Sequence, residues 1–172
     1  MRILKWVIIV LAVVVVIGQF IRPNMTNPPV DQTLTLQAHA PVPPDVDHNL
    51  HRACYDCHSY QTNWRFWTKV FPATWLVAND TNGGRQQLNF SEFGGYTKVK
   101  QARKLGALCE EVKSKDMPLW YYLPLHPEAK LSDADRQGIC TWATQLKSNL
   151  VATMTPAEKA QMNKRRAPAP KT

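Results

Sequence analysis

Two cysteines and a histidine stand close together in residues 53–64, "ACYDCHSYQTNW". Cys54 and Cys57 are separated by two residues, and His58 follows the second cysteine directly. Such a C-x-x-C-H pattern has three chemical interpretations: it can hold zinc, exchange thiols with a disulfide, or carry covalently attached haem. The rest of the chain has to decide among them.

Zinc and thiol exchange both lack the residues that would support them. A structural zinc site takes four ligands, usually from two closely spaced pairs. Here the remaining cysteines, Cys109 and Cys140, are thirty-one residues apart on separate predicted helices. A redox-active C-x-x-C motif typically opens a helix within a βαβ unit, and no segment of this chain alternates in the manner of a strand. Both interpretations are therefore disfavoured.

Covalent haem accounts for all five positions of the motif. Thioether bonds from Cys54 and Cys57 would hold the vinyl edges of the porphyrin. The imidazole of His58 would then lie beneath the ring and bind the iron axially. This interpretation also requires export from the cytoplasm, because haem c is attached to proteins outside that compartment.

The second axial ligand is a separate question with several candidates. Met117 precedes Pro118, which disfavours helical geometry at Met117 and fixes the chain beyond it, so a rigid loop could present the thioether sulfur to iron. Methionine is also a common filler of cores, and an open or water-filled site is a further alternative. The histidines that could compete are His39, His48, His51 and His126.

Three of these histidines are poor candidates. On a continuous helix His51 would be ~10 Å from His58 along the axis, too far for both to bind one iron. His39 lies within a proline-rich segment and His48 at its border, so we expect both to be solvated. We therefore expect Met117 as the distal ligand, with His126 as its rival.

The N-terminus predicts a membrane helix. Of residues 3–21 only Lys5, Gly18 and Gln19 are not apolar, and nineteen helical residues are just enough to cross a ~30 Å hydrocarbon layer. A cleaved signal peptide would have a shorter apolar core and a small-x-small cleavage site, and no good site follows. We therefore predict an uncleaved signal anchor over residues 1–22. Arg2 and Lys5 favour a cytoplasmic N-terminus and hence a periplasmic domain in a Gram-negative bacterium, although Arg22 weakens this asymmetry.

Composition divides the remainder of the chain. Residues 23–47 hold six of the thirteen prolines, which predicts an extended tether. Residues 48–150 form the expected domain, and residues 151–172 are predicted to be a basic, disordered tail. The net charge of +8 sits mainly at the two ends, and the body between residues 23 and 157 carries only +1. A basic face for nucleic acid is therefore not expected.

The domain is predicted to be all-α. Ser132 is a good N-cap for a helix whose apolar face recurs with helical period: Ile139, Trp142, Ala143, Leu146 and Leu150. A similar stripe predicts a helix over residues 98–115, and a third short helix should begin at Pro72 and run through "ATWLVAND". Residues 82–97 and 114–131 are interpreted as loops.

The other cysteines and the aromatic residues have more than one interpretation. Cys109 and Cys140 are either inert buried thiols or, in an oxidising compartment, a disulfide, which we favour. The aromatic side chains are expected to pack around a large flat cofactor: Trp64, Trp67, Trp75, Trp120, Tyr121, Tyr122 and Trp142.

Three blocks give the chain a family resemblance. They are "ACYDCHSYQTNW", "FPATWLVANDTNGGRQQLNFSEF" and "MPLWYYLPLHPEAKLSDADRQ". Over residues 50–145 the chain resembles the bacterial haem-binding domain family, relatives of class I cytochromes c. The resemblance implies one covalent haem c, bound proximally by His58, in a helical cytochrome-like domain. Members often have Met-Pro-Pro where this chain has Leu119 after Pro118, and His126 belongs to the same block.

The expected function follows from these parts. We expect a membrane-anchored monohaem c-type cytochrome that carries single electrons and catalyses no bond chemistry, with residues 3–21 in the cytoplasmic membrane and an unidentified redox protein as partner. One alternative is a haem enzyme or a sensor of gas or peroxide with an open sixth site. Another is a haem-bearing subunit of a larger membrane complex.

Overall fold

The computed structural model describes residues 2–164, and within them every regular element is helical, as predicted. The α-helices are α1 (Arg2–Phe20), α2 (Leu36–His39), α3 (Pro44–Ala53), α4 (Tyr55–His58), α5 (Ala73–Gln87), α6 (Lys98–Ser114), α7 (Asp133–Ala152) and α8 (Pro156–Asn163). Short 3₁₀ turns connect them: η1 (Phe66–Lys69), η2 (Phe90–Gly95), η3 (Leu123–Leu125) and η4 (Pro127–Ala129).

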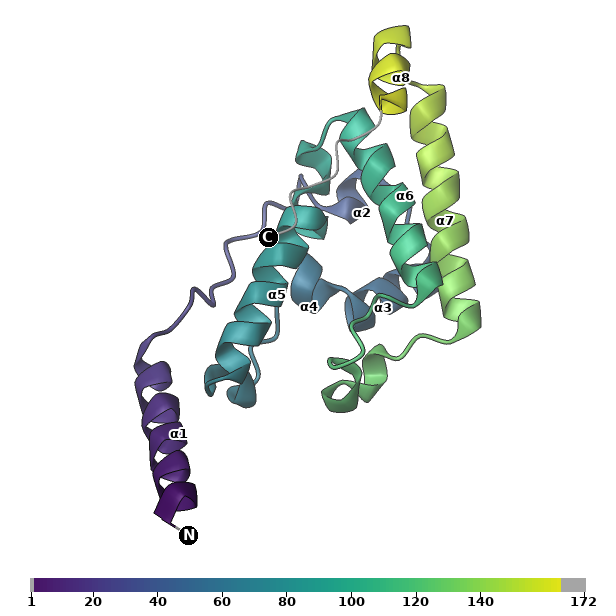
Figure 1. Cartoon of the computed structure of the whole chain (residues 1–172). Coiled ribbons are helices and arrows are strands. Elements are labelled where there is room, and N and C mark those ends of the chain that lie inside the picture. Colours follow the sequence, from purple (N-terminus) through teal and green to yellow (C-terminus); the bar gives the residue numbers. More distant parts are fainter. Residues whose placement is uncertain (1, 165–172) are drawn as a thin grey trace.

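Helices α6 and α7 form the frame of the domain and lie side by side (Figure 1). Helix α7 begins at the predicted cap, Ser132, which forms a capping box with Asp135, and α6 begins at Thr97, whose side chain accepts from the backbone N–H of Lys100. These caps satisfy backbone N–H groups that have no partner within the helix. The buried side chains that face one another across the pair are Leu105, Leu108, Val112, Ile139, Ala143 and Leu146.

A disulfide joins the two frame helices in the structure. It connects Cys109 of α6 with Cys140 of α7, thirty-one residues further along the chain. In the chain-entropy account, closing a loop of this length stabilises the fold by about 3–4 kcal/mol. The cross-link therefore adds to the apolar contacts that hold α6 against α7.

The expected tether is part of the folded domain from about residue 34 onward. Leu36 is fully buried, and Ala40 and Val46 lie in the same core as α6 and α7. The carbonyl of Pro41 accepts a hydrogen bond from Trp142 Nε1 at 3.0 Å. The prediction of a tether over residues 23–47 is therefore wrong for its second half. The prolines limit the chain to short helical pieces, but the apolar residues between them still find the core.

Two further segments are more ordered than expected. Helix α5 does not stop near residue 80 but continues to Gln87, and η2 follows it, so residues 82–97 are not a loop. At the other end, Thr155 forms a capping box for α8, and Met154 packs on Val99 and Ala102. Residues 151–164 are therefore not a disordered tail, while residues 165–172 lie outside the described part of the chain.

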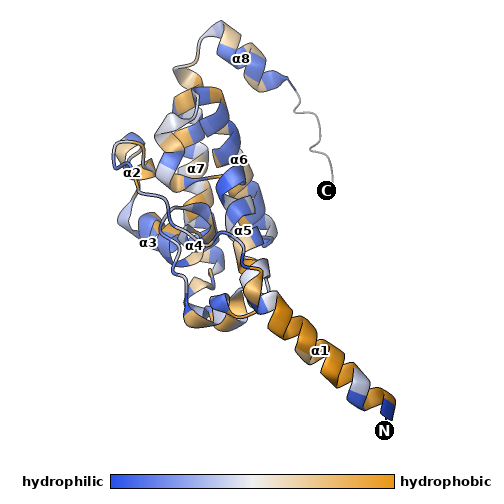
Figure 2. Cartoon of the chain, turned by 90° about the vertical axis from the view of Figure 1, so that its left-hand side faces the viewer, coloured by the Kyte–Doolittle hydropathy of each residue, from blue (hydrophilic) through white to orange (hydrophobic). Residues whose placement is uncertain are grey.

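Helix α1 projects away from the domain, which it contacts near its C-terminal end, and is apolar over nearly its whole length (Figure 2). None of its residues is buried. By length and composition it could cross a membrane, with nineteen residues of high mean hydropathy at the N-terminus of the chain. It projects from the end of the domain where α5 begins (Figure 1).

The burial of Leu36 gives a test of where the domain begins. Replacing Leu36 with alanine removes the three carbon atoms beyond Cβ from the buried core, so we expect the free energy of unfolding to fall by about 2–5 kcal/mol. Leu125→Ala is the matched control, since that leucine is 59% exposed and should change stability by no more than about 0.5 kcal/mol. Urea unfolding followed by circular dichroism measures both. Equal, small effects would show that residues 34–47 are a tether after all.

Candidate functional site

The C-x-x-C-H motif forms a single helical turn at the end of α3. The backbone N–H groups of Cys57 and His58 both donate to the carbonyl of Cys54, at 3.2 and 2.9 Å. Positions i, i+3 and i+4 of a helical turn lie on one face, so the two sulfurs and the imidazole share a side of the chain. Both cysteines are free thiols.

His58 is held in one orientation by α5. Its Nδ1 lies 2.9 Å from the carbonyl oxygen of Leu88, the residue that caps α5. A carbonyl only accepts, so Nδ1 carries the proton and Nε2 keeps its lone pair. Burial lowers the pKa of His58 from its ordinary value, which also favours the neutral ring. This is the state of an imidazole that ligates a metal.

The surroundings of the thiols do not suit redox exchange. Burial raises the pKa of Cys54 and of Cys57 to about 12, whereas thiol–disulfide exchange needs an accessible thiolate of lowered pKa. Within residues 2–164, no group of three or more His, Cys, Asp or Glu side chains is arranged to hold a bare metal ion. The raised thiol pKa values therefore do not favour a dithiol catalyst.

Helix α5 packs directly on the motif turn through a glycine. A Cβ atom added to Gly84 would lie 2.5 Å from the carbonyl oxygen of Cys57, whereas one added to Gly83 would meet nothing within 4 Å. Real Cβ atoms do not approach a carbonyl oxygen so closely, so only glycine permits this contact. One turn earlier, the fully buried hydroxyl of Thr81 lies beside the Cys57 sulfur and has no oxygen or nitrogen partner.

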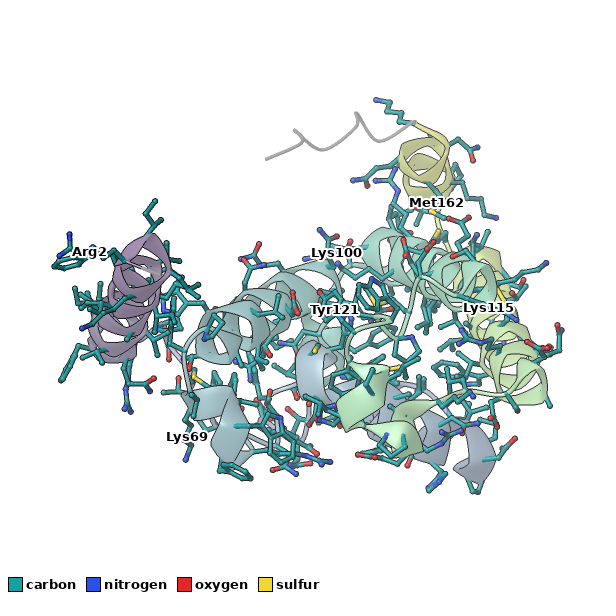
Figure 3. The ribbon with its side chains drawn as sticks, turned by 60° about the horizontal axis from the view of Figure 1, so that its bottom comes forward. Arg2, Lys69, Lys100, Lys115, Tyr121 and Met162 are labelled. Atoms are coloured by element: carbon teal, nitrogen blue, oxygen red, sulfur yellow. A yellow bond between two sulfur atoms is a disulfide. The ribbon has the colours of Figure 1, made fainter. Side chains whose placement is uncertain are left out.

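Two tyrosines of residues 119–126 hydrogen-bond the elements that carry and cover the motif. Tyr121 donates from its hydroxyl to Asp80 of α5 at 3.0 Å, and Tyr122 donates to Asp56 of α4 at 2.8 Å. Figure 3 shows Tyr121 near the middle of the molecule, beside α5. Burial raises the pKa of Tyr121 to about 12 and also raises that of Tyr122. Both hydroxyls therefore keep their protons, and residues 119–126 are anchored against the motif.

Met117 lies in the connection that follows α6, and hydrogen bonds fix both its backbone N–H and its carbonyl. Its N–H donates to the carbonyl of Glu111 at 3.1 Å, and its carbonyl accepts from Arg136 Nη1 at 2.9 Å. The same nitrogen of Arg136 donates to the carbonyl of Val112 at 2.7 Å. Arg136 thus ties the last turn of α6 and the Met117 connection to α7. The Met117 side chain is half-buried and Pro118 is buried.

His126 is packed between aromatic rings. It is 6% exposed, its ring stacks on Tyr122 at 3.7 Å between centroids, and Trp67 lies against it at 6.3 Å. Its Nδ1 donates to the carbonyl of Tyr122 at 3.0 Å. In the neutral ring, this hydrogen bond leaves the lone pair on Nε2. The stacking also gives His126 a structural role that does not require a ligand.

The three upstream histidines are all exposed. His39 Nε2 hydrogen-bonds the carbonyl of Thr33, and His51 Nδ1 bonds the carbonyl of Asp47 while its ring stacks on Tyr55. The expectation that His39 and His48 are solvated agrees with their exposure, although His39 lies in α2 of the folded domain and not in a tether.

Comparison with known protein families identifies the family of the chain. A family model described as a haem-binding domain matches residues 13–145, which is most of the chain. The chain belongs to the haem-binding domain family. No curated protein and no solved structure gives a significant match.

The residues of this haem-binding domain fit a covalently attached haem. Two free thiols and an imidazole with a bare Nε2 lie on one face of the motif turn. The Thr81 hydroxyl lies beside Cys57 and has no oxygen or nitrogen partner, so the sulfur is the group to which it can donate. Cys54 and Cys57 would hold the porphyrin through thioether bonds, and His58 would bind its iron.

The aromatic residues do not all gather at this site. Tyr121, Tyr122 and Trp67 pack near the motif or His126. Trp142 belongs to the core between α3 and α7, whereas Trp75 and Trp120 are exposed. The exposed Trp75 and Trp120 do not fit the prediction that all of these residues pack around a cofactor, and for Trp142, whose core cluster also contacts Cys54, it stays a prediction.

Several site residues could not be identified from the sequence. Gly84 and Thr81 lie in a stretch that was interpreted as the end of a helix and a loop, and Arg136 was an ordinary residue of a helix surface. Asp56, inside the motif, and Asp80, inside the second family block, stood in recognisable positions, but their tyrosine partners could be assigned only from the fold.

The neighbouring glycines of α5 provide a matched test of the contact with the motif. Gly84→Ala would push α5 away from the Cys57 carbonyl, and we expect a loss of about 1–3 kcal/mol in stability and a lower yield of covalent haem. Gly83→Ala has open space and should be neutral or stabilising by up to about 1 kcal/mol. Urea unfolding and haem staining of denaturing gels report the two quantities. If both variants behave alike, the close approach of α5 is not required.

Proposed function

We propose that this protein is a membrane-anchored monohaem c-type cytochrome that carries single electrons on the periplasmic side of the cytoplasmic membrane. Haem c, when bound, supplies a reversible one-electron couple at iron. The protein residues attach it, orient it and set its ligands. The observation that carries the proposal is the orientation of His58, whose protonated Nδ1 on the Leu88 carbonyl leaves Nε2 for iron.

Met117 is the distal ligand that we propose. Its thioether needs no deprotonation, and its backbone is fixed by Glu111 and Arg136 in a way that would hold the sulfur in place. His126 is the rival, but its packing between Tyr122 and Trp67 already accounts for its burial. A methionine opposite histidine gives a relatively high reduction potential and fills the sixth position, which favours electron transfer over catalysis.

Two features support the compartment. Helix α1 is long and apolar enough to cross a membrane. Arg2 and Lys5 lie in its first turns, where basic residues favour a cytoplasmic end. The disulfide between Cys109 and Cys140 suits an oxidising compartment. An N-terminus in the cytoplasm and a folded domain in the periplasm satisfy both, and the redox partner would then be a periplasmic protein or a membrane complex.

The absorption spectrum tests the ligand assignment. The ferric protein should be low-spin with a weak band at the red end that reports sulfur bound to iron. Met117→Ala should abolish this band and produce a high-spin form, whereas His126→Ala should retain it. Met162→Ala, a methionine on α8 far from the motif, is the control. Loss of the low-spin form in His126→Ala alone would instead assign His126, and a high-spin wild-type spectrum would favour an enzyme or sensor.

The role of Arg136 gives a second test of the same ligand. Hydrogen bonds from a charged donor contribute about 1.5–3 kcal/mol each, so Arg136→Ala should free the Met117 connection and weaken the sulfur–iron band. Arg136→Lys keeps one charged donor and should restore part of it. Arg103→Ala is the matched control, because that arginine also donates to backbone carbonyls but at α8. Equal effects from Arg103→Ala and Arg136→Ala would show that general destabilisation explains the change.

A further inference from the structure

The exposed large apolar side chains of the domain are confined to two short segments. Over the described residues after Ile21, every large hydrophobic side chain that is strongly exposed lies within residues 66–76 or 120–125. We call this set the anchor-side patch: Phe66, Val70, Trp75, Leu76, Trp120 and Leu125. Phe66 and Trp120 are the most exposed, at 78% and 79%. Single exposed apolar residues are ordinary, but a clustered set marks an interaction surface.

The two segments of the patch are next to each other in the fold. Arg65, just before η1, forms an ion pair with Glu128 of η4 at 2.7 Å. Trp67 of η1 lies against His126. Tyr121 and Tyr122 turn their hydroxyls inward to Asp80 and Asp56. These contacts hold residues 66–76 and 120–125 at one end of the domain, where η1 and the loop after α6 lie in Figure 1.

The same end of the domain is fastened to the end of α1. Gln19 donates from Nε2 to the carbonyl of Lys69 at 2.7 Å and accepts from the backbone N–H of Phe71 at 3.0 Å. Trp75 Nε1 donates to the carbonyl of Ile21 at 2.9 Å. The patch therefore begins where the apolar helix ends, and both views show α1 leaving the domain from this end (Figures 1 and 2).

From this continuity we propose that the anchor-side patch lies in the interfacial layer of the same bilayer that α1 crosses. The proposal rests on the membrane anchor of the proposed function and goes beyond it, because it orients the domain. Tryptophan favours the headgroup level of a membrane, exposed phenylalanine and leucine insert at the boundary of headgroups and acyl chains, and basic side chains beside them reach the phosphates. Lys69 and Arg22 are exposed at this junction, and Figure 3 shows Lys69 on the side of the domain nearest α1.

A bilayer is the occupant that the geometry favours over a protein. The hydrogen bonds of Gln19 and Trp75 place η1 and the start of α5 within one helical turn of the last apolar residues of α1. Any membrane that contains α1 is therefore already at the patch, without a separate binding event. A protein partner would have to displace lipid from the same position.

Spin labels on the full chain in lipid nanodiscs test this orientation. With Cys54 and Cys57 in thioether bonds and Cys109 paired with Cys140, an introduced cysteine is the single free thiol. Phe66→Cys and Leu125→Cys place labels on the patch. Val13→Cys places one within α1, and Ala160→Cys places one on exposed α8 at the opposite end. An unchanged haem spectrum shows that each labelled chain is folded.

Collision of the labels with oxygen and with a water-soluble nickel chelate reports depth in the bilayer. We expect the patch labels to collide several-fold less with nickel and more with oxygen than the α8 label does, with the α1 label deepest. If the α1 label is in lipid and the patch labels match the α8 label, the orientation is wrong and the anchor stands. Patch labels shielded from both reagents would mean a protein cover and would also overturn it. An α1 label in water would overturn the anchor and the orientation together.

Discussion

The close approach of α5 to the motif turn is the contact on which the site depends. Because Gly84 has no side chain, the helix backbone lies directly on the Cys57 carbonyl. That approach brings Thr81 to the Cys57 sulfur and the Leu88 carbonyl to His58 Nδ1. A four-residue turn such as α4 could not hold a histidine in one tautomer by itself. The orientation of the imidazole is therefore a tertiary property, supplied by a helix thirty residues downstream.

The other side of the site is held by the frame helices. Arg136 bonds the end of α6 and the Met117 carbonyl together, and the capping box of α7 at Ser132 fixes where the helix that carries Arg136 begins. The disulfide and the apolar seam keep α6 and α7 in register. Motions that would swing Met117 must therefore break charged hydrogen bonds or the frame itself. Such a rigid arrangement suits the proposed electron-carrier role, in which the charge of the site would change without a change of shape.

The sequence predicted the elements whose signals are local. The apolar residues of α6 and α7 recur with helical period. Ser132 is a residue type that commonly caps a helix, so it predicts where α7 begins. The fold of residues 34–47 was not predicted, because prolines separate their apolar residues and the composition suggested a tether. In the structure, Leu36 and Val46 reach the core. The C-terminal half of α5 was not predicted as helix, because glycines and asparagines in isolation favour loops. There, a long-range contact outweighs local propensity.

In the proposed electron-carrier role, the contacts between the end of α1 and the start of α5 restrict how a redox partner could reach the haem domain. A long proline-rich tether would let the haem domain search a wide volume above the membrane. Here Gln19, Ile21 and Trp75 fasten the end of α1 to the beginning of α5, and Arg85 of α5 donates to the carbonyl of Thr26 within the connection itself. The distance from the anchor to His58 is then set by the rigid length of α5. A partner would have to meet the domain at one height and in one orientation, which favours a partner that shares the membrane.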